Sequence, residues 1–213
     1  MFNVMAMGGL AAAMLLSPAS APVSSVDSPP PAGQISITVV TVNGSGCPAG
    51  TAAVASAADN TSFTVTYSDY LAQVGVGAKP TDLRKNCQLN LQVGVPQGFT
   101  FAIAQADYRG FAYLADGATG LERANYYFQG MSPTASISHP FAGPFADDWQ
   151  TTDKTDVAAL VYAPCGEQRN LNINTELRVG IGTSDPTTTT SFMSMDSTDS
   201  SVNTIYHLAW RQC

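Results

Sequence analysis

The sequence contains few charged residues and very few cationic ones. Of its 213 residues only 12% are charged, and nine Lys and Arg face sixteen Asp and Glu, which gives a net charge of −7. No cationic residue occurs before Lys79. Because contacts to phosphate dominate the affinity of proteins for nucleic acid, and anionic lipids also attract basic clusters, the composition predicts neither partner.

Catalytic signatures are scarce as well. The chain has only two histidines, His139 and His207, and no serine lies in the Gly-x-Ser-x-Gly pattern of a nucleophile elbow. We therefore expect both histidines to be structural or surface residues, and we predict no catalytic triad and no cofactor. Whether the protein is an enzyme stays open, with a non-catalytic role favoured.

The N-terminus resembles an export signal. Residues 1–21 form an uncharged apolar run that ends with the small residues Ala19 and Ala21, although the usual basic start is missing. The alternatives are an apolar N-terminal strand or a misassigned start codon. Residues 22–33 are rich in Pro and Ser and predict a propeptide or flexible lead-in. No segment is apolar over the 20 or so residues that a membrane span needs, so we expect a secreted, extracellular protein with its domain over residues 34–213.

Four widely spaced cysteines follow this signal. Zinc sites usually contain closely spaced ligands, and none of the four has a Cys or His within four residues, so we expect disulfides and no metal. Three pairings are open. We favour Cys47 with Cys87 and Cys165 with Cys213, because each bridge then joins neighbours in order and the second fixes the last residue. Asn43 and Asn60 begin N-glycosylation sequons, which matter if the source is a eukaryote.

Strand patterns dominate after residue 33. Apolar and polar residues alternate over residues 88–95, 99–104 and 171–179, as in strands with one buried face. Weaker strand candidates, marked by β-branched and aromatic residues, are 34–42, 62–67, 110–114, 123–129, 157–162, 190–195 and 203–211. Helical periodicity is scarce: residues 52–58 are Ala-rich without large apolar residues at helical spacing, and only a short helix near Leu71 or Asp147 stays open.

About nine strands without repeating helices predict an all-β fold. The expected architecture is one antiparallel β-sandwich, similar to a jelly roll, with two disulfides. Residues 130–155 contain three prolines and no sustained period, so we expect a long surface loop there.

Several ordered motifs resemble the secreted proteins grouped as domain of unknown function 4360. They are Gly44-Ser45-Gly46-Cys47-Pro48-Ala49-Gly50, Lys85-Asn86-Cys87-Gln88-Leu89, Asp107-Tyr108-Arg109-Gly110, Tyr126-Tyr127-Phe128-Gln129-Gly130, Ala163-Pro164-Cys165-Gly166, Leu171-Asn172-Ile173-Asn174 and Trp210-Arg211-Gln212-Cys213. The resemblance covers essentially the chain from Gln34 onward. It implies a secreted, disulfide-bonded, β-rich domain of fungi and some bacteria, and it implies no activity.

Two groups of residues are candidates for ligand binding. In the predicted loop, Trp149 could stack on a sugar ring while Asp147 and Asp148 accept hydrogen bonds from hydroxyl groups; the alternative is a solvated loop held by one buried Trp. Asp107 and Arg109 share one side of a strand whose earlier apolar residues face the core, so either a bulge intervenes or the pair lies at the edge of the core. They could form a structural ion pair or bind a ligand.

The polar sides of two strands could also form a binding surface. Gln88, Asn90 and Gln92 on one strand, and Asn172, Asn174, Glu176 and Arg178 on another, would give an amide-rich face suited to sugar hydroxyls if both strands lie in one sheet. Plain solvent exposure explains them equally well.

These features favour a non-catalytic extracellular module that contacts a glycan, a cell wall or a host surface. The alternative is a hydrolase of extracellular polysaccharide that uses paired carboxylates; a structural wall protein is a third option. Candidate carboxylates are Asp107, Glu122, Asp147, Asp148, Glu167 and Glu176. Calcium at Asp147, Asp148, Asp153 and Asp156 is a weaker alternative, because the ordered spacing of a calcium loop is missing.

Overall fold

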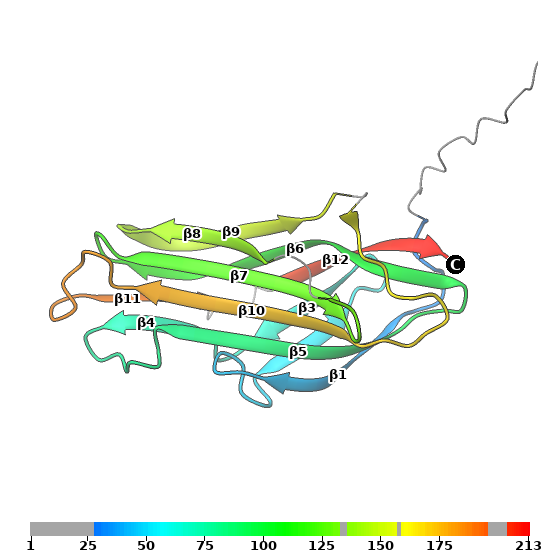
Figure 1. Ribbon diagram of the computed structural model, residues 1–213, viewed down its shortest axis with the longest axis horizontal. Coiled ribbons are helices and arrows are strands. Elements are labelled where there is room, and N and C mark those ends of the chain that lie inside the picture. Colours follow the sequence, from blue (N-terminus) through cyan, green and yellow to red (C-terminus); the bar gives the residue numbers. More distant parts are fainter. Residues whose placement is uncertain (1–27, 133–135, 157–158, 196–203) are drawn as a thin grey trace, which may run out of the picture.

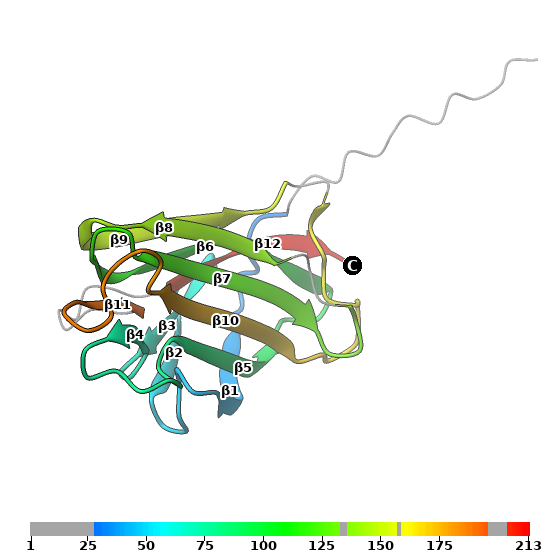
Figure 2. The ribbon, with the colours of Figure 1, turned by 60° about the vertical axis from the view of Figure 1, so that its left-hand side comes forward.

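The computed structural model describes residues 28–132, 136–156, 159–195 and 204–213, and two antiparallel sheets face each other in it (Figures 1 and 2). The strands are β1 (Ser36–Asn43), β2 (Ala52–Ser56), β3 (Ser62–Tyr67), β4 (Leu71–Gly75), β5 (Arg84–Gly94), β6 (Phe99–Leu114), β7 (Thr119–Phe128), β8 (Ile137–Ala142), β9 (Phe145–Lys154), β10 (Leu171–Gly180), β11 (Thr190–Met195) and β12 (Thr204–Gln212). The five-stranded sheet has the order β1-β5-β10-β7-β8. The seven-stranded sheet has the order β2-β3-β12-β6-β11-β4, with β9 paired to β6. The predicted all-β sandwich is confirmed.

Apolar and polar residues alternate along the strands, and the apolar ones point into the core. In β5, Leu89 and Leu91 are fully buried between the sheets, while Asn90 between them faces outward. Ile173 and Leu177 of β10 do the same beside them. Burying a side chain of this size contributes about 1.5–3 kcal/mol, so the alternation fixes both the register and the outward polar face.

Strand β6 changes its inward side at a bulge. Gln105 pairs with His207 and Ile103 pairs with Leu208, so Ala104 is an extra residue in the ladder. Phe101 lies in the core before the bulge, and Tyr108 lies in the core after it. The bulge is the first of the two alternatives that the sequence left open, and it turns Asp107 and Arg109 to the outer face.

The prediction of a surface loop over residues 130–155 is wrong, because β8 and β9 occupy most of it. The inward side of β9 carries Phe145, Asp147, Trp149, Thr151 and Asp153, so three of its five residues are polar and the hydrophobic period is hidden. In β8, Pro140 is tolerated because β8 is the edge strand of its sheet.

One of the weaker strand predictions fails, and the short helices that the sequence left open do not form. The segments for which a short helix stayed open, near Leu71 and near Asp147, are the strands β4 and β9, and most of the Ala-rich segment is β2. The strand predicted over 157–162 is not formed at residues 159–162, while 157–158 lie outside the described residues. Within the described ranges, no helix is long and apolar enough to cross a membrane.

Both favoured disulfides are present. Cys47–Cys87 joins the segment after β1 to β5 and is fully buried, whereas Cys165–Cys213 ties the C-terminus to the segment before β10 and is exposed. The proposed signal peptide and the first half of the lead-in, residues 22–27, lie outside the described residues. From Ser28 onward the lead-in contacts the domain: the Ser28 amide donates to the Trp210 carbonyl at 2.7 Å.

The buried side chain of Asn60 holds this lead-in. Its amide nitrogen donates to the Pro31 and Gly33 carbonyls, each at 2.9 Å, and its oxygen accepts from the Ile35 amide. The Asn60 nitrogen that a glycan would modify therefore already donates two hydrogen bonds inside the folded protein, whereas Asn43 is exposed.

Two glycines of the family-like motifs have a packing reason. A Cβ at Gly110 would lie 2.7 Å from the Trp149 indole and 1.9 Å from the Ser194 carbonyl oxygen. A Cβ at Gly46 would lie 2.2 Å from the Tyr70 ring. Both distances are well inside van der Waals contact, so only glycine lets these aromatic rings reach the core.

Candidate functional site

Of the predicted aromatic and acidic site, the structure leaves only the two aspartates exposed. Trp149 points between the sheets, is only 3% exposed, and packs on Phe141 with ring centroids 5.5 Å apart. Asp147 and Asp148 are exposed on β9, and the Asp147 carboxylate accepts from the Asp148 backbone amide. A role for the two aspartates in ligand contact stays a prediction, but Trp149 offers no free ring face beside them.

Asp107 and Arg109 lie on the outer face of the seven-stranded sheet, where Asp107 pairs with another residue. The Asp107 carboxylate contacts His207 Nε2 at 2.8 Å and accepts from the Thr152 hydroxyl at 2.6 Å and from Gln105. Burial opposes ionisation of Asp107, but these hydrogen bonds outweigh it and lower its pKa. Asp107 thus pairs with His207 in place of the Arg109 ion pair that the sequence left open, and a ligand role for Asp107 and Arg109 stays a prediction.

The weaker calcium alternative is not assembled either. Asp147 and Asp148 face solvent on β9, whereas Asp153 on the same strand points between the sheets. Asp156 lies beyond the end of β9. Asp147 shares its side of β9 with Asp153 but lies six residues away, about 20 Å along a strand, and Asp148 lies on the opposite side, so one ion cannot contact all three.

A different cluster lies between the sheets at the edge formed by β7, β8 and β9. Glu122 of β7 stands opposite His139 of β8 in the ladder, and Asp153 of β9 approaches from the other sheet. The His139 Nε2 atom is 2.7 Å from Asp153 Oδ1 and 4.0 Å from Glu122 Oε2. Figures 1 and 2 show β8 and β9 side by side at this edge.

The carboxyl groups of this cluster are buried. Glu122 is 0% exposed and Asp153 is 3% exposed, whereas 25% of the His139 side chain reaches solvent. Burial, together with the nearby charge of Asp153, raises the pKa of Glu122 to about 9, although the Thr151 hydroxyl opposes the shift. Among the described residues, no group donates a hydrogen bond to Glu122 Oε1.

A row of tyrosines continues from the cluster into the core. The Tyr126 hydroxyl donates to Asp153 Oδ2 at 2.7 Å and contacts the hydroxyl of Tyr108. Burial raises the pKa of Tyr108 and Tyr126 well above the usual value for tyrosine, so both stay neutral. Tyr206 lies next, with its ring edge-on to both of them. Neutral hydroxyls thus orient Asp153 from inside.

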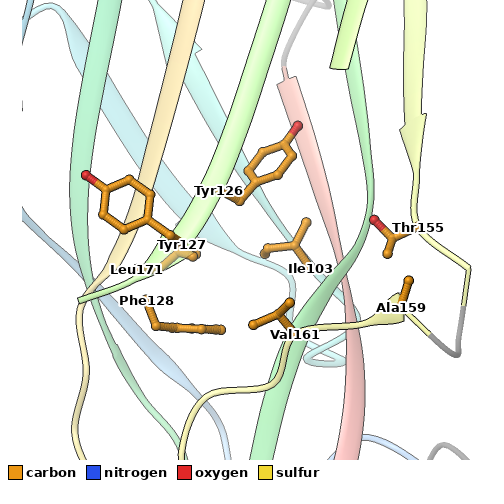
Figure 3. A pocket seen from close by; sticks show the side chains of 8 residues that line it. All are labelled: Ile103, Tyr126, Tyr127, Phe128, Thr155, Ala159, Val161 and Leu171. Atoms are coloured by element: carbon orange, nitrogen blue, oxygen red, sulfur yellow. The ribbon is translucent and has the colours of Figure 1, made fainter. Parts of the chain in front are cut away.

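Tyr126 also closes one end of a small apolar pocket (Figure 3). The pocket holds about 40 Å³ and is lined mainly by aliphatic and aromatic side chains, among them Ile103, Phe128 and Val161. Figure 3 shows the Tyr126 hydroxyl pointing away from Phe128. Ligand pockets in proteins usually hold about 300–1,000 Å³, so this pocket is small for a sugar ring.

The predicted amide-rich face does form, because β5 and β10 are neighbours in the five-stranded sheet. Asn90 donates to Asn172 at 2.8 Å across the two strands, and Asn174 donates to Asn125 of β7 at 3.1 Å. Asn170 donates to Asn90 at 2.7 Å. These bonds hold the amide groups in fixed orientations on the outer surface of the sheet.

Three arginines surround one glutamate on the same face. Arg84, Arg123 and Arg178 come from three adjacent strands and all bond the carboxylate of Glu176, at 2.7 Å for Arg84 Nε, 3.3 Å for Arg123 and 2.8 Å for Arg178. Burial opposes ionisation of Glu176, but the hydrogen bond and charge of Arg84, with the other two arginines, lower its pKa. The group carries a net charge of +2 in a chain of net charge −7.

A depression of about 370 Å³ joins the arginines to the amides. Its lining includes Arg84, Asn86, Gln88, Arg123, Asn125, Ser136, Asn174 and Glu176. We call these eight residues, with Arg178, the arginine-amide face. Of this face, the sequence indicated Gln88, Asn174, Glu176 and Arg178. It did not indicate Arg84 and Arg123, because nothing in the sequence placed their strands beside Glu176.

The comparisons with known proteins agree with this description. Residues 33–213 match the family model called domain of unknown function 4360. An uncharacterized secreted protein of Arthroderma benhamiae is 36% identical over 180 residues, which cover 84% of this chain and 72% of that protein. The chain therefore belongs to this family, and the predicted resemblance is confirmed. The protein is a secreted, disulfide-bonded β-sandwich.

The similarity to solved structures is weak. The enzymatically active domain of tailspike protein 4 of bacteriophage CBA120 matches with a TM-score of 0.26 and 13% identity, over 84% of this chain and 19% of that one. A similarity at that level carries no inference about fold or function.

Proposed function

We propose that the protein is a non-catalytic extracellular module that binds an acidic glycan at the arginine-amide face. The observation that carries the proposal is the concentration of cationic groups: three of the nine Lys and Arg residues surround one carboxylate beside an ordered amide network. In an acidic protein, such a concentration directs an anionic ligand to this one face.

The donors and acceptors of the face fit such a ligand. A guanidinium has five N–H donors, and the bonds to Glu176 engage two of Arg84 and one each of Arg123 and Arg178. The remaining geometry suits the carboxylate of a uronic acid, which arginine binds through two parallel hydrogen bonds. The neighbouring amides both donate and accept, as sugar hydroxyls require.

A polysaccharide hydrolase remains the second candidate, and one observation favours it: the buried Glu122 has a pKa of about 9 and lies close to Asp153. A glycosidase needs one protonated and one ionised carboxyl group on either side of the sugar bond. However, Glu122 exposes none of its surface. A sugar ring cannot reach it without opening the sandwich, so we favour binding at the outer face.

The test is a binding screen on the purified mature protein. We expect retention on polygalacturonate, with little on neutral dextran, and weaker retention as salt rises, because exposed charges are screened within about 8 Å at physiological ionic strength. Each of Arg84→Gln and Arg123→Gln should weaken binding by about 10-fold or more, as expected for a lost charge-assisted hydrogen bond.

Arg211→Gln is the matched control, because Arg211 stacks on Tyr162 at the end of the other sheet and its loss changes the net charge equally. Equal loss of binding in all three variants would mean that net charge, and not the arginine-amide face, governs retention. Retention on dextran and polygalacturonate alike would contradict an acidic ligand.

A further inference from the structure

The Glu122–His139–Asp153 cluster has the composition of a metal site. One imidazole nitrogen and two carboxylate oxygens come from three strands, and the three ligand atoms lie within 4.8 Å of one another. Bonds of about 2.0–2.2 Å place two ligand atoms of a tetrahedral zinc ion roughly 3.4 Å apart. The observed separations from His139, 2.7 Å to Asp153 and 4.0 Å to Glu122, lie on either side of that value.

A second observation, independent of the clustering, is the unpartnered oxygen of Glu122. The residue is 0% exposed, and within the described part of the chain its Oε1 atom accepts no hydrogen bond. Leaving a buried polar atom without a partner costs about 1–3 kcal/mol. The Glu122 oxygen closest to His139 is Oε2, so a cation beside His139 and Asp153 would supply the missing partner if it bound both oxygens of the Glu122 carboxylate.

The outer contacts of the carboxylates also match a metal site. The Tyr126 hydroxyl donates to the Asp153 oxygen that faces away from His139, and the Thr151 hydroxyl donates to Glu122 Oε2 at 3.3 Å. Hydrogen bonds of this kind orient the ligands of metal ions in proteins. His139 is partly exposed, so an ion can enter at the sheet edge.

The second His–Asp pair of the chain shows what a purely structural pair looks like here. His207 and Asp107 are 2.8 Å apart, but Thr152 and Gln105 donate to Asp107, and among the described residues no other carboxylate joins them in a metal-like group. Both pairs contain one imidazole and one aspartate. Only the cluster at His139 adds a buried carboxylate with an unpartnered oxygen.

We propose that Glu122, His139 and Asp153 bind a divalent first-row transition metal ion, for which Zn²⁺ is the best probe. One imidazole with two carboxylates suits zinc better than calcium or magnesium, which prefer oxygen ligands alone. The ion would join β7 and β8 of one sheet to β9 of the other. The sequence-based prediction of no metal rested on the spacing of the cysteines, and nothing in sequence spacing brings Glu122, His139 and Asp153 together.

The experiment uses the untagged mature protein, stripped with chelator and titrated with ZnCl₂ by calorimetry. We expect one ion per chain, and Co²⁺ in its place should give the visible absorption of a tetrahedral site. Glu122→Gln and His139→Gln should weaken Zn²⁺ binding at least 100-fold. His207→Gln, the matched control, should bind as the wild type does.

A measurement on the wild type keeps the proposal testable if a variant fails to fold. The chain has two histidines, so ¹H–¹⁵N spectra of the imidazoles should show His139 shifting with one equivalent of Zn²⁺ while His207 does not. Absence of binding at 100 µM Zn²⁺, a shift of His207 alone, or full binding by folded Glu122→Gln would overturn the site. None of these results bears on glycan binding, which lies on the other side of the five-stranded sheet.

Discussion

Replacing Trp149 by alanine tests whether the residue belongs to the core or to a ligand surface. The indole is 3% exposed, packs on Phe141, and covers Gly110 so closely that an added Cβ there would lie 2.7 Å from the ring. Truncating a buried Trp to Ala costs about 3–5 kcal/mol, through lost transfer energy and the cavity left behind. We expect a loss of this size, because strand backbone on either side cannot collapse into the space.

The loss should appear as a large shift in thermal unfolding. For a domain of 150–250 residues, 1 kcal/mol lowers the melting temperature by about 2–4 °C, so Trp149→Ala should melt about 6–20 °C below the wild type. Tyr113→Ala is the control, because Tyr113 is an aromatic residue of the paired strand β6 that is 46% exposed. Its loss should cost less than about 1 kcal/mol.

Calorimetry or circular dichroism melts would decide the matter. An unchanged melting temperature for Trp149→Ala, combined with weaker glycan binding, would refute this reasoning. It would support the surface role that the sequence suggested for Trp149 together with Asp147 and Asp148.

Three further predictions concern covalent state and charge. Mild reductant should open the exposed Cys165–Cys213 bridge before the buried Cys47–Cys87 bridge, as thiol-labelling mass spectrometry would show; simultaneous opening would contradict the burial argument. Loss of either bridge should lower the free energy of unfolding by about 4 kcal/mol, because the bridges close loops of 40 and 48 residues. Folding lowers the pKa of Glu176, so its ionisation stabilises the protein above the unfolded pKa, and that stability is lost as pH falls through the folded pKa. The difference in free energy of unfolding between the wild type and Glu176→Gln, measured by urea titration, should therefore disappear in acid. A difference that does not change with pH would argue against this role. If the protein is made in a glycosylating host, peptide mapping should find glycan at Asn43 and none at the buried Asn60, and modified Asn60 in folded protein would conflict with its hydrogen bonds.

The sequence predicted the fold wherever burial has a regular period. Leu89, Leu91 and Ile173 alternate with polar residues, and the structure places them in the core. The pattern failed at β9, because Asp153 and Thr151 occupy inward positions that normally carry apolar residues. These two polar residues of β9 belong to or adjoin the buried cluster. The hydrophobic period therefore failed to predict the strand at the place where this cluster forms.

The sequence predicted more of one candidate site than of the other. The amide face needed only the assumption that two alternating strands share a sheet, and the ladder between Asn90 and Asn172 confirms it. Glu122 was named among six carboxylates, but nothing in sequence spacing pairs it with His139 and Asp153. The contact forms because β8 and β9, which follow each other after a short turn, belong to different sheets.

The most direct test of acidic-glycan binding follows the side-chain amides of Asn and Gln in ¹H–¹⁵N spectra while galacturonate oligomers are added. Binding at the arginine-amide face predicts saturable shifts at Gln88, Asn125 and Asn174, which line the depression beside the arginines. Gln105 and Gln150, which belong to the other sheet, should stay in place. Shifts confined to Gln105 and Gln150, or no shift at millimolar oligomer, would contradict binding at the arginine-amide face.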